Sequence, residues 1–193
     1  MSLEIISYNS EKIIIQNLFE GGEISNIEII QKRTISLFSE FIEKIINSLN
    51  SSKELSRFKP EKEILNIRKF IYHSMRLIVD SEESTFSKIK FYSLYDHLDN
   101  SLYSIEKLVK ILGQKKYDPK TINLIEEILM LFIKFLHLKK NLEIDSLNQL
   151  IIERHKLIKK ISASKLKIED SKLIREIKIF LNLHNDFILA NLK

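Results

Sequence analysis

The sequence predicts an all-α fold, and three observations lead to this prediction. Only three Gly and two Pro occur among the 193 residues, which leaves few positions for the tight turns of a β-rich or α/β fold. Leu, Ile, Lys and Glu are abundant, and apolar side chains recur at the spacing of amphipathic helices. Because 44% of the residues are hydrophobic, the chain can bury one sizeable core. We therefore expect a bundle of six helices in a single domain.

The first half of the chain predicts three of these helices. Apolar residues at helical spacing predict the first helix over residues 23–50. Pro60 suits the first turn of a helix, so the second helix is expected over residues 60–80. Ser84 ends a Ser-Glu-Glu-Ser turn and suits the N-cap of the third helix, which Gly113 would terminate.

The second half predicts the other three. Asp118 and Pro119 are suited to the N-cap and first position of the fourth helix. The fifth helix is expected over residues 143–162 and the sixth over residues 168–192. Residues 4–22 are expected to form a shorter leading helix, because a pair of glycines closes that segment.

The two halves resemble each other, which predicts an internal repeat. Leu65, Asn66 and His73 recur as Leu147, Asn148 and His155, at an offset of 82 residues. Ser84, Leu94, His97, Asp99 and Leu102 recur as Ser171, Leu181, His184, Asp186 and Leu189, at an offset of 87. We expect two three-helix repeats, 23–113 and 114–193, that share one core. They would follow a leading segment, 1–22, whose first three residues resemble a tag remnant. Chance similarity between helices rich in Ile, Leu and Lys is the alternative.

Several stretches occur in an order and spacing that resemble a known family. They are Ile27-Glu28 through Phe38 and Ile42, Ser81 through Ser84, Leu94 through Ile105, and Leu142 through Leu147 followed by Arg154-His155. These stretches resemble the first, third and fifth helices of PhoU-type domains, which are built from two three-helix repeats. The resemblance covers residues 24–192.

This resemblance implies one of two kinds of PhoU-like protein. The leading segment and the Glu-Ile-Asp-x-Leu…Arg-His pattern are more similar to the domain that follows the membrane part of sodium/phosphate cotransporters. That domain would be cytoplasmic, tethered to the inner membrane, and would regulate or assemble phosphate transport. Its partners would be the membrane part of the same protein, a phosphate transport system or a second copy in a homodimer. The other kind is a free-standing regulator of phosphate uptake signalling, and a helical scaffold unrelated to phosphate also remains open.

The resemblance also suggests where a metal would bind. PhoU relatives hold divalent or iron metals through carboxylates one helical turn apart, a spacing that places two oxygen ligands on one helix face. The matching positions are Asp96 and Asn100 in the first repeat and Leu183 and Phe187 in the second. Three of these four side chains are not carboxylates, so we predict no metal cluster of the family type. Asp96, Asp99 and Asn100 are the weak candidates, and the alternative is that the two aspartates are solvated or pair with Lys or Arg.

The sequence predicts no enzyme and no cofactor. It contains no Cys, no Gly-rich phosphate loop, no Gly-x-Ser-x-Gly and no His-Glu-x-x-His. The matched histidines, His73 with His155 and His97 with His184, are predicted to be structural. The net charge of +5 comes from 31 basic and 26 acidic residues that are interspersed, so nucleic-acid binding is not indicated. Contact with an anionic membrane surface would fit the same charge equally well.

Overall fold

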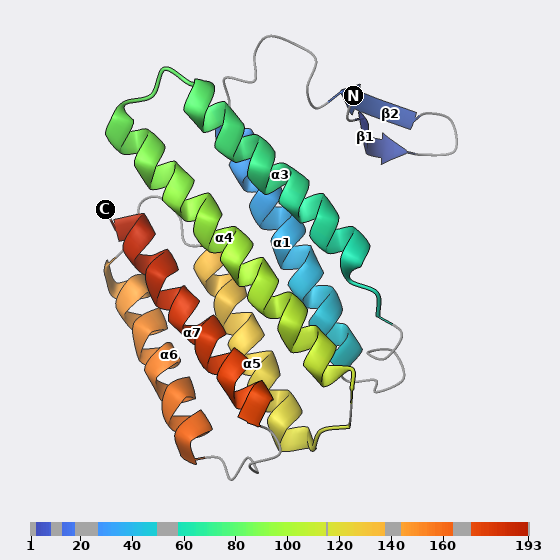
Figure 1. Ribbon diagram of the computed structural model, residues 1–193, viewed down its shortest axis with the longest axis vertical. Helices are drawn as coiled ribbons and strands as arrows, with labels where there is room; N and C mark the ends of the chain where they lie inside the picture. The colour runs from blue at the N-terminus through green and yellow to red at the C-terminus, as the bar shows by residue number, and fades with distance from the viewer. Residues whose placement is uncertain are drawn as a thin grey trace.

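The computed structural model describes residues 3–8, 13–17, 27–49, 58–114, 116–137, 144–163 and 171–192, and the side chains of 29–49, 58–114, 116–137, 145–163 and 171–183. Six helices run side by side, up and down, in a bundle (Figure 1). They are α1 (Ile27–Leu49), α3 (Glu61–Asp80), α4 (Thr85–Leu112), α5 (Pro119–Leu136), α6 (Ile144–Ala163) and α7 (Ser171–Leu192). The prediction of an all-α bundle is confirmed, and each helix begins within a few residues of its expected start.

The leading segment differs from the prediction. Two antiparallel strands, β1 (Leu3–Tyr8) and β2 (Ile13–Asn17), pair where a short helix was expected. A run of three isoleucines opens β2, and β-branched side chains favour extended backbone over helix. The apolar residues of this segment therefore mark a hairpin, and the pair of glycines was not evidence for a preceding helix.

Side-chain caps define the starts of α4 and α5 as the sequence predicts. The Ser84 hydroxyl accepts a hydrogen bond from the backbone N–H of Ser87 at 3.2 Å. One carboxylate oxygen of Asp118 accepts the N–H groups of Lys120 and Thr121, at 3.0 and 3.2 Å. These bonds satisfy donors that have no partner within the first helical turn.

The helices pack as two groups of three. In one group α3 contacts α1 and α4, and in the other α6 contacts α5 and α7. The groups meet through α4 against α7, which is the most extensive contact between helices, and through α1 against α5 (Figure 1). Their apolar side chains form one continuous core.

Aromatic side chains occupy the junction of the two groups. The ring of Phe132 on α5 lies 5.6 Å from that of Phe38 on α1 and 5.0 Å from that of Phe180 on α7, edge to face in both pairs. All three side chains are fully buried. Phe41 and Phe135 are buried as well.

One buried position in α6 is charged. Arg154 is 8% exposed, and its Nε donates a 2.8 Å hydrogen bond to the backbone oxygen of Leu181 on α7. A buried guanidinium needs such acceptors, because leaving water costs it several kcal/mol. This hydrogen bond from Arg154 therefore fixes the position of α6 along the axis of α7.

Among the described residues, no helix is both long and apolar enough to span a membrane.

Candidate functional site

The structure separates the residues that were the weak metal candidates. The amide of Asn100 donates to a carboxylate oxygen of Asp96 at 3.2 Å, on the exposed side of α4. Asp99 instead faces α3, where it accepts hydrogen bonds from Arg68 Nε at 3.2 Å and from the Tyr72 hydroxyl at 3.1 Å. Asp99 thus pairs with an arginine, as one of the two alternatives expected. Within the described ranges, no three His, Asp or Glu side chains gather in a way that could hold a metal ion.

The matched histidines lie in different environments. Burial, and then the nearby Arg76, lowers the pKa of His73. His155 is exposed, and its Nδ1 lies 2.8 Å from the backbone oxygen of Ile151. His97 is half-buried, and the side chain of His184 is not among those described. The structure does not bring His73, His97 and His155 into one site.

A histidine that the sequence analysis did not single out makes a contact across the core. His137 follows the last residue of α5, and its Nε2 lies 3.1 Å from the Ser39 hydroxyl on α1. Ser39 is buried, so this bond gives it a polar partner inside the bundle. The sequence signal was a histidine at a helix end, which is too common to predict a contact with a specific residue.

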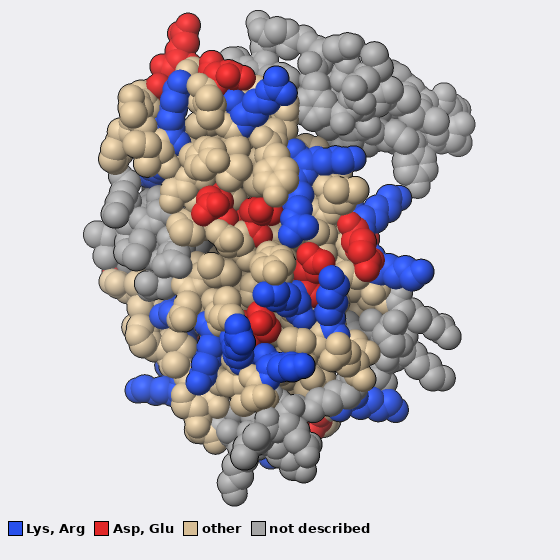
Figure 2. All heavy atoms as spheres, in the orientation of Figure 1, with Lys and Arg blue, Asp and Glu red and all other residues tan. Residues whose placement is uncertain are grey.

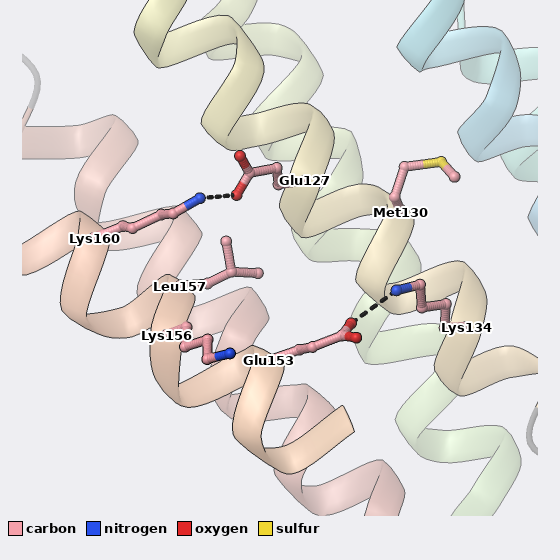
Figure 3. A pocket seen from close by; sticks show the side chains of 7 residues that line it. All are labelled: Glu127, Met130, Lys134, Glu153, Lys156, Leu157 and Lys160. Carbon is pink, nitrogen blue, oxygen red and sulfur yellow. Dashed lines mark hydrogen bonds and ion pairs between the residues drawn. The ribbon is translucent and has the colours of Figure 1, made fainter. Parts of the chain in front are cut away.

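A shallow groove of about 310 Å³ runs between α5 and α6 (Figure 3). Lys134 on α5 pairs with Glu153 on α6 at 2.8 Å, and Lys160 on α6 pairs with Glu127 on α5 at 2.6 Å. Leu157 lies between the two pairs. Each helix thus contributes one lysine and one glutamate to bridges that cross the groove.

These bridges make the groove a poor reaction site. Both lysines are more than half exposed, at 53% and 57%, so water solvates their charges and neither is desolvated as a reactive amine would be. The groove is lined by Glu127, Met130, Lys134, Glu153, Lys156, Leu157 and Lys160, which include no Ser, Cys or His nucleophile. Its ion pairs hold α6 against α5, and exposed pairs of this kind contribute at most about 1 kcal/mol each.

A second surface is distinguished by its exposed apolar side chains. Among the described residues, seven of the eleven exposed large apolar side chains lie on α3 and α4. They are Leu65, Tyr72 and Val79 on α3, and Phe86, Ile89, Tyr92 and Tyr103 on α4. We call this surface the α3–α4 face. Concentration on two neighbouring helices, rather than scatter, is typical of an interaction site.

The apolar residues of the α3–α4 face form rows along the two helices. Leu65, Tyr72 and Val79 are seven residues apart, so successive members lie two turns apart on one side of α3. Hydrogen bonds between α3 and α4 fix the position of one row relative to the other along the helix axes. Close to the turn that joins the two helices, Lys88 Nζ donates to the backbone oxygen of Val79 at 2.8 Å, and two helical turns away along α3 the Tyr72 hydroxyl donates to Asp99.

Figure 2 shows the α3–α4 face from the front. Uncharged side chains are interspersed there with acidic and basic ones, at the top of the view as well as along its middle. Lower on α4, the ammonium of Lys107 lies 4.2 Å from the centre of the Tyr103 ring, a cation–π contact that leaves Tyr103 52% exposed. The α3–α4 face therefore carries apolar and charged side chains together along its length.

Both helices of this face carry charges of both signs. The middle turns of α3 hold Arg68, Lys69 and Arg76 and its ends carry acidic residues, whereas the middle turns of α4 hold Asp96, Asp99 and Glu106 and its ends carry lysines. Arg68 bridges Asp99 at 3.2 Å and Glu106 at 3.6 Å. In the part of the chain that the structure describes, Lys69, Arg76 and Asp96 form no ion pair.

Comparison of the chain with protein-family models, with curated proteins and with solved structures found no match. The sequence resemblance and the geometry described above are therefore the grounds on which a function is proposed. Of the two surfaces, the α3–α4 face has the properties of an interaction site, and the α5–α6 groove has those of a contact between helices.

Proposed function

We propose that the chain is a non-catalytic, PhoU-like domain of a sodium/phosphate cotransporter, which regulates or assembles phosphate transport. The observation that carries the proposal is a recurrence of buried positions between the two groups of three helices. The link to phosphate comes from the sequence resemblance alone.

The recurrence is clearest between α3 and α6. Five of the six buried positions of α3, at 64, 67, 71, 74 and 78, match the five buried positions of α6, at 147, 150, 154, 157 and 161, at an offset of 83 residues, while the sixth, Phe70, matches the partly exposed Glu153. The starts of the two helices, Glu61 and Ile144, differ by the same number. Two amphipathic helices always match at some offset, so agreement with the helix starts is what supports a repeat.

This offset corrects the sequence-based alignment by one residue. At an offset of 82, Leu65 is matched with Leu147, but Leu65 is 57% exposed and Leu147 is 6% exposed. One residue corresponds to a rotation of about 100° around a helix, which turns a buried position outward. In α4 and α7 an offset of 86 likewise matches the helix starts, Thr85 and Ser171.

A domain of this kind would act by contact rather than by chemistry. Packing of the α3–α4 face against a partner shifts a transporter between its states only if the face contacts one state better than the other. In the proposed setting the domain is cytoplasmic and the membrane part of the same protein tethers it. The ion-paired groove between α5 and α6 agrees with a non-catalytic role.

Phosphate uptake by cells that carry the complete gene tests the proposal. Deleting residues 27–192 is expected to change sodium-dependent uptake of labelled phosphate while the membrane part still reaches the membrane. Tyr92→Glu, on the α3–α4 face, is expected to reproduce part of the change. Ile152→Glu is the matched control, because Ile152 is similarly exposed, at 54% against 49%, but lies on α6.

Two results would redirect the proposal. A gene without membrane-spanning segments upstream of residue 4, together with capture of a histidine kinase or an ABC-type phosphate transporter, would point to the free-standing regulator. Unchanged phosphate uptake after deletion of the domain would leave a helical scaffold with no role in phosphate transport.

A further inference from the structure

We draw no further inference here: the strongest candidate, the patch of exposed apolar side chains on the α3–α4 face, carries none because nothing in the described part of the structure shows what covers it.

Discussion

Phe132 offers the most direct test of the packing between the two groups of helices. The Phe132→Ala substitution removes a fully buried ring that contacts Phe38 on α1 and Phe180 on α7, at 5.6 and 5.0 Å between ring centres. Buried Phe→Ala substitutions cost about 3–5 kcal/mol through lost transfer free energy and the cavity left behind. Edge-to-face pairs add to that cost beyond their area. We expect a loss of about 4 kcal/mol in the free energy of unfolding.

For a domain of this length, such a loss lowers the Tm by about 8–16 °C. Urea unfolding followed by far-ultraviolet circular dichroism gives the free energy, and a thermal scan gives the Tm. Met130→Ala on the same helix is the control, because Met130 is 44% exposed and its loss should cost less than about 1 kcal/mol. If Phe132→Ala costs no more than this control, the junction of α1, α5 and α7 is not packed as described.

Three further predictions concern single interactions. Asp118→Ala removes the N-cap of α5 and is expected to cost about 1 kcal/mol, whereas Asn123→Ala, exposed on the same helix, should cost less; urea unfolding measures both. Hydrogen bonds from Thr121 lower the pKa of Asp118. The stability advantage of wild type over Asp118→Ala should therefore be complete above the pKa that Asp118 has in the unfolded chain, and it should disappear as the pH falls through its pKa in the folded chain. Lys160→Ala removes the bridge to Glu127 and should cost less than about 1 kcal/mol, with a smaller cost in high salt. The hydrogen bond to Asp99 raises the pKa of Tyr72 from 10.0, because the bond holds the phenol in its protonated form. The stability advantage of wild type over Tyr72→Phe should therefore be lost as the pH rises through the pKa of Tyr72 in the folded state.

Helix positions could be predicted from the sequence because their signals are local. Ser84 and Asp118 act as N-caps in the structure as their side-chain chemistry predicts. The apolar spacing of each helix also predicted a buried stripe, because a stripe at helical spacing must face other apolar surface. The leading segment failed for an equally local reason: its β-branched isoleucines favour a strand, and the pair of glycines after it was given too much weight.

The register of the proposed repeat and the α3–α4 face could not be predicted in the same way. Identical letters at Leu65 and Leu147 suggested an alignment that burial shifts by one residue. Whether an apolar side chain such as Tyr92 is covered depends on which neighbour lies against that side of its helix. A single helix pattern does not contain that information, since α4 has neighbours on two sides and solvent on the third.

The buried Arg154 has a consequence for how this chain assembles. Under the proposed repeat, the two triplets of helices are similar, which creates a risk of misassembly in which α6 docks where α3 belongs. Such a swap would put Arg154 in the place of Ile71, which is fully buried, and away from the Leu181 oxygen that it binds. A buried charge without its acceptor costs several kcal/mol, so the swapped form would be disfavoured. Arg154 would thus favour, during folding, the arrangement in which α6 packs with α5 and α7.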